Sequence, residues 1–391
     1  MISDILNICW LIIQLLIGYN LVLPLLMAVI SGFFKNAYLS TGNQPKYDYA
    51  IVVTAYEQTG LLPQVIASLL KLNYSNYIIY LVADKCDTSN LFFDDDKVIL
   101  LKPETVLASN IKSHQYAIEN FIRPHDIITI IDSDNLTDPE YINELNVFFD
   151  NGFEAVQGLR KAKNLNTTFA CLDAARDLYY HYYDGEILFK LGSSATLAGS
   201  GMAFKTNLYQ ACITDLAYSG AGFDKVVQAK ILLAGKRIAF AKKAIVYDEK
   251  TTNAAQLVNQ RSRWINTWFR FSKFGLDILA QGIKKGNINQ SLFGLIVIRP
   301  PLFIFLILSV LFLGISLIIG SSVYLFWIMG LLSFVIGFAI SLVRQPTDPK
   351  IYKSLINIPK FIFFQVVSLI HAKGANKRSV ATKHIINTQN S

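Results

Sequence analysis

A long stretch near the C-terminal end, Leu302 to Val343, contains no charged residue. It has about twice the ~20 apolar residues that a helix needs to cross a bilayer, so it predicts two spanning helices. The Gly320-Ser321-Ser322 break would form the tight turn between them. A second apolar run, from Ile8 to Phe34, is too long for a signal-peptide core and predicts one more span. We therefore expect three membrane-spanning helices.

Basic residues next to these runs predict how the chain crosses the membrane. None precedes the first span, whereas Lys35 and Lys46 follow it, and Arg344, Lys350 and Lys353 follow the third. Because Lys and Arg are concentrated in cytoplasmic segments, we expect the N-terminus outside and the central domain and C-terminus in the cytoplasm. The sequence thus predicts an integral protein of the cytoplasmic (inner or plasma) membrane.

A fourth apolar segment, Leu355 to Ile370, is short and contains Pro359 and Lys360. If it crossed the membrane, the basic residues after it would be exported, so we expect an amphipathic helix lying in the interface. Aromatic and basic residues at helical spacing between Leu257 and Lys285 predict another interfacial helix. The expected divisions are an N-terminal transmembrane anchor (1–36), a cytoplasmic domain (37–256), interfacial helices (257–298), two transmembrane helices (299–345), and an interfacial helix with a cytoplasmic tail (346–391).

The overall composition fits this division. The chain is 52% hydrophobic and only 16% of its 391 residues are charged, against roughly a quarter in a soluble protein, and its mean hydropathy is +0.37. The net charge of +8 needs no nucleic acid as a partner, because much of the excess lies beside membrane segments, where anionic headgroups attract it. The four cysteines show no paired spacing, so we expect neither disulfides nor a zinc site.

The middle of the chain predicts a parallel sheet with crossover helices. Short apolar, β-branched runs at 49–54, 77–83, 98–101 and 127–131 alternate with helical spacing at 58–72 and 110–121, an order typical of an α/β fold. Such sheets bind ligands at the carboxyl ends of their strands. Thr54, Asp84 and Asp132 would lie at that edge, so we expect a binding site there.

A pair of carboxylates, in Asp132-Ser133-Asp134, follows the last of these strands. Two carboxylates at a strand exit can both reach one Mg²⁺ or Mn²⁺, which takes oxygen ligands and bridges the phosphates of a nucleotide diphosphate. An acid-rich turn after a strand is also common where no metal binds. The pair therefore predicts a metal-assisted nucleotide site only in combination with a second motif.

That second motif is Gln260-Arg261-Ser262-Arg263-Trp264. Gln260, Arg263 and Trp264 are three and four residues apart and would share one helical face. Arg263 could grip a pyrophosphate with its planar guanidinium, and Trp264 offers a flat surface to a sugar ring. The alternative is an interfacial aromatic residue beside an arginine that binds lipid headgroups.

Together, the strand-end aspartate, Asp-x-Asp, a later lone aspartate and Gln-x-x-Arg-Trp resemble the membrane-bound inverting glycosyltransferases of family 2. These include the synthases of cellulose, hyaluronan, chitin and Nod-factor backbones. The resemblance runs from about residue 49 to residue 290. It implies an α/β, GT-A (Rossmann-like) glycosyltransferase domain with a mostly parallel central sheet, together with transmembrane and interfacial helices.

The resemblance also implies roles for individual residues. Asp134 would bind Mg²⁺ or Mn²⁺, and Asp224 would be the catalytic base. The chain departs from the family pattern in its first turn, where Thr54 replaces a proline and Glu57 replaces an asparagine. The nucleotide sugar would contact Thr54, Tyr56, Glu57, Asp84, Asp132, Gln260, Arg263 and Trp264. The acceptor would contact Gly199, Ser200, Gly201 and Trp264.

Asp224 opens a predicted helix after Gly222-Phe223, and an aspartate in such a position usually only caps the helix. Its assignment as the base rests on the resemblance and on sequence order. Four other aspartates are interpreted as capping or turn residues, namely Asp87, Asp138, Asp215 and Asp248.

The expected function is transfer of a hexose or N-acetylhexosamine from a nucleotide sugar, by preference UDP-linked, to a polysaccharide at the cytoplasmic membrane face, with β-linkages. Three spans are few for a polymer channel, so this function would need an oligomer or a partner subunit. One alternative is a single addition to a lipid-linked acceptor, which needs no channel. Another is a non-catalytic membrane protein that binds nucleotides. A transporter is disfavoured because the later spans contain no charged residue.

Overall fold

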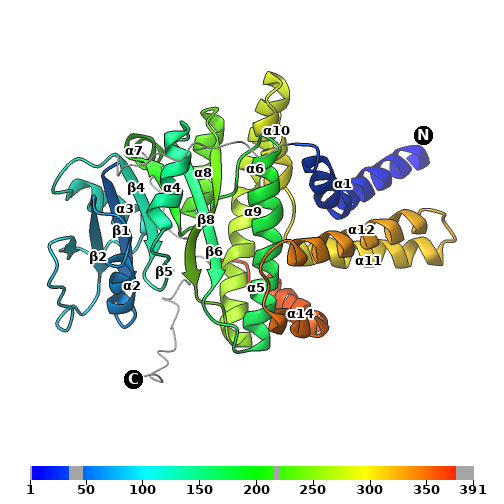
Figure 1. The fold of residues 1–391 in the computed structure, drawn as a ribbon. Coiled ribbons are helices and arrows are strands. Elements are labelled where there is room, and N and C mark those ends of the chain that lie inside the picture. Colours follow the sequence, from blue (N-terminus) through cyan, green and yellow to red (C-terminus); the bar gives the residue numbers. More distant parts are fainter. Residues whose placement is uncertain (1, 35–46, 215–220, 376–391) are drawn as a thin grey trace.

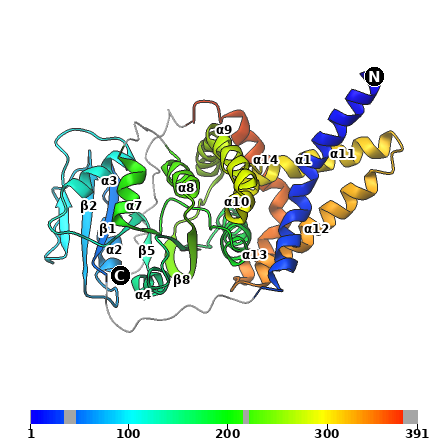
Figure 2. The ribbon, with the colours of Figure 1, turned by 90° about the horizontal axis from the view of Figure 1, so that it is seen from above.

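The computed structural model describes residues 2–34, 47–214 and 221–375 of the chain. A central sheet with helices on both faces forms one side of the molecule, and a group of long apolar helices extends from the other side (Figure 1). The same arrangement is visible from above, where α1, α11 and α12 lie on the side away from β1 and β2 (Figure 2). The described chain thus has an α/β part and a helical part.

The sheet has eight strands in the order β3-β2-β1-β4-β7-β6-β8-β5. Strands β1 to β4 are mutually parallel, β7 is antiparallel to both of its neighbours, β6 and β8 are parallel, and β5 is antiparallel to β8. The strands are β1 (Tyr49–Tyr56), β2 (Tyr77–Asp84), β3 (Val98–Leu101), β4 (Ile127–Asp132), β5 (Leu136–Thr137), β6 (Ala155–Ala162), β7 (Met202–Lys205) and β8 (Ile238–Asp248). The predicted α/β class with a mostly parallel central sheet is confirmed.

Helices cover both faces of the sheet, and alternate residues of each strand face opposite layers. Ile51 and Val53 of β1 pack in a cluster with α2 (Leu62–Leu69) and α4 (Tyr141–Asp150). Ala50 and Val52 pack in the cluster on the other face, which includes α3, α7 and α8. These three helices are α3 (Asn110–Glu119), α7 (Thr206–Ile213) and α8 (Phe223–Leu233). Burial on both faces explains why the central strands are continuous apolar runs.

Two long helices, α5 and α9, lie between the sheet and the helical part (Figure 1). Helix α5 (Thr168–Tyr180) continues into a π-helical segment, η1 (His181–Ile187), and the short α6 (Leu188–Lys190). Helix α9 (Ala254–Lys285) has 32 residues and begins at Asn253, whose side chain accepts a hydrogen bond from the backbone of Gln256. It ends at Gly286, in a left-handed conformation, and the chain returns along it as α10 (Ile288–Val297).

The remaining long helices are α1 (Ile2–Ser31), α11 (Leu302–Ile318) and α12 (Tyr324–Val343), which pack against one another. Trp327 of α12 is fully buried and donates a hydrogen bond from Nε1 to Oε1 of Gln14 in α1, at 3.2 Å. Most of the outward surface of these helices is apolar and exposed, as expected for helices surrounded by hydrocarbon.

By length and composition, three helices of the described chain could cross a membrane: Asn7–Ser31, Tyr324–Val343 and Pro349–Ile370. The number equals the predicted three, but the set differs. Helix α11 has only 17 residues and reaches the required length only together with α10, as a pair bent by 73°. The segment that the sequence assigned to the interface, Leu355 to Ile370, is long enough when α13 (Pro349–Ser354) is added.

This last segment is not one straight helix. Helix α13 is followed by a 3₁₀ turn, Leu355–Asn357, and by α14 (Ile358–Ile370). Helix α14 packs mainly against α9, and both views draw it at the base of α11 and α12, near α5 and α9 (Figures 1 and 2). Its packing against the two helices next to the sheet is compatible with the predicted interfacial position.

The close packing of α9 against α10 generates a testable prediction. A Cβ atom on Gly294 of α10 would lie 2.7 Å from the backbone N and Cα of Leu279 in α9. We expect Gly294→Ala to force the two helices apart and to lower the free energy of unfolding by about 1–3 kcal/mol. Thermal unfolding in detergent would measure the change.

Gly314→Ala is the matched control, because a Cβ on Gly314 of α11 meets no atom within 4 Å. Alanine is favoured over glycine in a helix interior by about 0.5–1 kcal/mol, so this variant should not be less stable than the parent. Equal melting temperatures for the two variants would contradict the close packing of α9 and α10.

Candidate active site

Three strands bring the first group of predicted residues to one edge of the sheet. In the register of the parallel strands, Thr54 of β1 lies beside Asp132 of β4, and Tyr56 of β1 lies beside Asp84 of β2. These are the carboxyl ends of the strands, where α/β sheets bind ligands. The predicted convergence of Thr54, Asp84 and Asp132 is therefore confirmed.

The turn after β1 has an unusual backbone. Glu57 has φ 60° and Lys85, after β2, has φ 54°, a left-handed conformation that side chains other than glycine seldom adopt. The two residues form an ion pair, Lys85 Nζ to Glu57 Oε1 at 2.7 Å. Such strained residues concentrate at binding sites, but this pair is exposed to solvent and lies outside the cavity described below.

Asp84 is buried and its carboxylate already has two partners. It accepts hydrogen bonds from the backbone N–H groups of Leu107, at 3.0 Å, and Ala108, at 2.7 Å. Ala108 has φ 47°, so the carboxylate holds this loop in a strained conformation. The contact between Asp84 and the nucleotide stays a prediction.

Asp132 and Asp134 lie at the end of a large cavity. Burial, and next the charge of Asp134, raise the pKa of Asp132 to about 7, while the nearby Arg160 opposes the rise. The backbone N–H of Asp132 donates to Oγ of Ser200 at 3.0 Å, which fixes the turn that carries both carboxylates. Two acids whose charges interact in this way favour either a shared proton or a bound cation.

The two carboxylates at this position suit a divalent metal that takes its remaining ligands from the bound substrate. Within the described residues, no group of three or more Asp, Glu, His or Cys side chains is arranged to hold a metal ion. Mg²⁺ and Mn²⁺ sites of phosphate-transfer chemistry commonly use one or two carboxylates and take their other ligands from phosphates and water. Asp132 and Asp134 fit that pattern, with Asp134 as the predicted ligand.

The glycine-rich segment 199–201 places only one of its three predicted acceptor residues in the cavity. Gly199, with φ 88°, lines it. Ser200 is fully buried and bonded to the turn of Asp132, and Gly201 donates its backbone N–H to the carbonyl of Ile130 at 2.9 Å. Ser200 therefore cannot contact an acceptor in this structure; its side chain supports the carboxylate turn instead.

Asp224, the predicted base, lies in the first turn of α8 and lines the cavity. Gly222, before it, has φ 99°, and a Cβ there would lie 2.5 Å from Cγ2 of Thr267 in α9. Only glycine allows this close approach. Lys225 Nζ lies 3.0 Å from Asp224 Oδ2 and donates to the carbonyl of Leu197 at 2.5 Å. The carboxylate is thus held at the wall formed by α9.

The structure also shows where the other candidate aspartates lie. Asp87 and Asp138 accept hydrogen bonds from backbone N–H groups two residues ahead, as predicted for turn residues, and lie outside the cavity. Asp215 lies outside the described residues. Asp248 was interpreted as a turn or capping residue, and this is wrong, because it is buried in the cavity wall and paired with Arg160 and Lys250.

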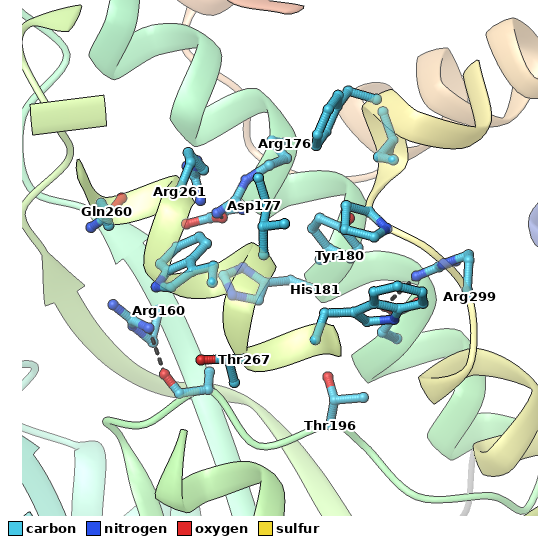
Figure 3. A pocket seen from close by; sticks show the side chains of 18 of the residues that line it. Arg160, Arg176, Asp177, Tyr180, His181, Thr196, Gln260, Arg261, Thr267 and Arg299 are labelled. Atoms are coloured by element: carbon cyan, nitrogen blue, oxygen red, sulfur yellow. Dashed lines mark hydrogen bonds and ion pairs between the residues drawn. The ribbon is translucent and has the colours of Figure 1, made fainter. Parts of the chain in front are cut away.

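One face of α9 also lines the cavity, and it carries Gln260, Arg263 and Trp264. Figure 3 shows Gln260 in this position. Oε1 of Gln260 is buried and has no hydrogen-bond partner among the described residues. Trp264 is 39% exposed, and two guanidinium groups lie near its ring, Arg261 at 4.0 Å and Arg176 at 4.5 Å from the centroid. The cations hold the indole in place and leave part of its surface open.

Sequence reasoning missed the buried charges that surround this face. Arg261 pairs with Asp173 and Arg176 pairs with Asp177, both acids of α5. Lys250 joins Asp177, at 2.5 Å, to Asp248, at 2.6 Å. Arg160 of β6 completes this series of ion pairs, since its Nη2 lies 2.8 Å from the same Asp248 oxygen.

The opposite charges of neighbouring side chains favour the ionised forms in this series of ion pairs. Burial alone would raise the pKa of Asp248, but Arg160 and Lys250 hold it below its usual value. His181, which also lines the cavity, has its pKa lowered by burial to about 4 and is neutral at pH 7. One sequence signal was available: Asp173, Arg176 and Asp177 are three and four residues apart and would share one face of an otherwise apolar helix.

Apart from Asp173, all of these charged side chains border a single cavity of about 1100 Å³, together with His181. In Figure 3, Gln260 and Arg160 lie at the left, Asp177 and His181 near the centre and Arg299 at the right. Thr54, Tyr56, Glu57 and Asp84 do not line it. The predicted nucleotide residues therefore form two groups, one at the edge of the sheet and one in the cavity, and Asp132 belongs to both.

Comparisons with known proteins find structures of similar fold. The chain is similar in fold to the mannosyltransferase PcManGT from Pyrobaculum calidifontis, solved in complex with GDP-Man and Mn²⁺, with a TM-score of 0.56 and 13% identity over 90% of this chain and 95% of that one. It also aligns with residues 1–349 of TarS from S. aureus in complex with UDP-GlcNAc, with a TM-score of 0.44 and 14% identity over 84% of this chain and 90% of that one. No curated protein sequence matches significantly.

The first of these similarities confirms the GT-A fold, the nucleotide-sugar glycosyltransferase architecture that the sequence predicted. Residues 45–267 also match the family model described as "Glycosyltransferase like family 2". Because this match covers more than half of the chain, the protein belongs to the family 2-like glycosyltransferases.

Proposed function

We propose that the protein transfers a hexose or N-acetylhexosamine from a nucleotide sugar to a glycan hydroxyl at the cytoplasmic face of a membrane, and that it inverts the anomeric carbon. The observation that supports this most is the shared cavity. Asp134, Asp224 and the Gln260 face of α9 are far apart in the sequence, yet all of them border it. A base, a candidate metal ligand and a polar helix face around one space are what sugar transfer requires.

In this mechanism Asp224 accepts the proton of the acceptor hydroxyl. The acceptor oxygen forms a bond to the anomeric carbon, and the bond from that carbon to the phosphate oxygen breaks on the opposite face. Arg263 stabilises the charge on the departing nucleotide diphosphate with its guanidinium. A single displacement turns an α-linked donor into a β-linked product.

A divalent cation held by Asp134, with Asp132 beside it, would neutralise charge on the diphosphate. Trp264 would support the sugar ring with the exposed part of its indole, which Arg176 and Arg261 hold in position. Gln260 Oε1, buried without a partner among the described residues, would accept a hydrogen bond from the donor. At the edge of the sheet, Thr54, Tyr56, Glu57 and Asp84 would surround the nucleoside.

Two findings bear on the nucleotide of the donor. The resemblance of the motifs favours a UDP-sugar, whereas PcManGT, the similar structure with the TM-score of 0.56, was solved with GDP-Man. We propose UDP as the nucleotide and include GDP-sugars in the test below.

Two acceptors were left open by the sequence, a polysaccharide and a lipid-linked glycan. Polysaccharide synthesis in this chain would require a channel formed with another copy or with a partner subunit. The described part of the chain contains three helices, or up to four, that could span a membrane. The part of the cavity wall that α11 and α12 form is apolar. This observation favours the lipid-linked acceptor.

A panel of radiolabelled UDP- and GDP-sugars, incubated with membranes that contain the protein, tests the proposed function. Asp224→Asn should lower transfer by about 10²–10⁴-fold, because the amide cannot accept the proton, while nucleotide binding persists. Asp138→Asn is the matched control, since Asp138 lies outside the cavity and an amide preserves its turn. Near-full transfer by Asp224→Asn would show that another group is the base.

Removal of the metal provides an independent prediction. EDTA should abolish transfer, and added Mg²⁺ or Mn²⁺ should restore it. In Asp134→Ala, the Mn²⁺ concentration for half-maximal nucleotide binding should rise by about tenfold or more, since one of two carboxylates is lost. Glu104→Ala, which removes an exposed acid outside the cavity, should leave that concentration unchanged. Identical Mn²⁺ titrations for Asp134→Ala and the parent protein would contradict the assignment of the ligand.

A further inference from the structure

The cavity does not end at the candidate reaction site. It continues from Asp132 and Asp224 to a wall formed by α11, α12 and α14. The part of the wall that comes from α11 and α12 contains only apolar side chains, among them Leu306, Phe334 and Leu342. An occupant that extended along this part of the wall would meet no hydrogen-bonding side chain, whereas α14 contributes Gln365 to the rest of it.

This wall is open on its outer side. Phe303, Phe334 and Leu342 are buried and form its floor. By contrast, Val310 is 58% exposed and Val335 is 60% exposed, and both line the cavity. Because α12 is long and apolar enough to cross a membrane, exposed apolar residues at this rim would face lipid chains. A hydrocarbon chain could therefore enter the cavity sideways.

A buried cation borders the same cavity at the point where the chain enters α11. Arg299 directly precedes Pro300-Pro301 and α11, lines the cavity (Figure 3), and is only 6% exposed. Its Nη2 donates to Oδ2 of Asp184, in the π-helical segment η1, at 2.5 Å. Its Nη1 is buried and has no hydrogen-bond partner among the described residues.

An unbonded guanidinium N–H in a buried position is costly unless a ligand completes it. The planar fork of arginine suits a phosphate, because two N–H groups can bind two oxygens. The same cavity joins an apolar wall, this guanidinium and the candidate reaction site. A ligand that consists of a hydrocarbon chain, a phosphate and a sugar would offer a matching group to each of the three.

We propose that the acceptor is a sugar linked to a membrane lipid phosphate, whose hydrocarbon chain lies against α11, α12 and α14 and whose phosphate binds Arg299. This inference rests on the proposed function and names the class of its acceptor. The cavity, at about 1100 Å³, exceeds the ~300–1,000 Å³ of a typical small-ligand site, so it has room for more than a sugar. A growing polysaccharide fits this wall poorly, because its hydroxyls would lose their hydrogen bonds to water without replacement.

Photocrosslinking of the full-length protein tests the proposal. The probe is a long-chain alkyl phosphate that carries a photoreactive diazirine near the end of its chain, added to the protein in detergent. We expect labelled peptides to come from α11, α12 or α14 at residues that line the cavity. Hexadecyl phosphate should compete at least about tenfold better than hexadecanol, because only the phosphate can bind Arg299. Labelling confined to the outer surface of α1 would overturn the proposal, as would equal competition by the alcohol.

Two variants of one helix provide the matched comparison. Leu306 and Leu311 are both leucines of α11, but only Leu306 lines the cavity, and Leu311 is 52% exposed. Leu306→Trp places a larger side chain in the cavity and should lower labelling at least fivefold. Leu311→Trp should leave labelling unchanged. Equal labelling of the two variants would contradict the proposal. The position of the label in the parent protein decides the question even if Leu306→Trp does not fold.

The experiment separates this inference from the proposed function when nucleotide binding is measured on the same preparation. Binding of a nucleotide sugar without cavity labelling would overturn the lipid site and leave sugar transfer in place. Cavity labelling without binding of any nucleotide sugar would overturn the proposed function and, with it, the acceptor role of the lipid.

Discussion

Buried charges between the sheet and α9 fix the two halves of the site relative to each other. One half, Asp132 with Asp134, belongs to the sheet, and the other, Gln260 with Trp264, belongs to α9. The charges that join them alternate in sign, from Arg160 through Asp248, Lys250, Asp177 and Arg176 to Asp173 and Arg261. A buried ion pair adds little net stability, but removal of one partner costs about 3–5 kcal/mol, since the other charge is left unpaired. The network therefore fixes one arrangement of β6, β8, α5 and α9.

The same arrangement connects the sheet to the long apolar helices. Helix α10 packs closely against α9 at Gly294, and the bend between α10 and α11 contains Arg299. Asp184 of η1, which continues α5, pairs with that arginine. Through these contacts the position of the long apolar helices follows from that of α5 and α9. A site for sugar transfer and an apolar cavity wall can then share one continuous space.

Local sequence patterns were sufficient for much of this architecture. The β-branched runs predicted β1 to β4, and the register of those strands brought Thr54, Asp84 and Asp132 together as expected. The spacing of Gln260, Arg263 and Trp264 predicted their common face on α9. These features depend on periodicity within one element, which a single sequence displays directly.

Other features depend on contacts between distant residues and could not be predicted. Asp248 resembled a turn aspartate because its partners, Arg160 and Lys250, meet it only through the pairing of β6 with β8 and the turn that follows. Ser200 resembled an acceptor contact, yet the fold buries it beneath the Asp132 turn. Arg299 lies just before a long apolar segment in the sequence, and its buried pairing with Asp184 joins residues 115 positions apart.

The central claim is a single displacement in which Asp224 acts as the base on the face opposite the leaving group. The anomeric configuration of the first sugar transferred tests it most directly. It can be read by NMR from the coupling at the anomeric proton of a product made from an α-linked nucleotide sugar. The mechanism predicts a β-linkage. An α-linkage would mean retention of configuration and would contradict the role given to Asp224.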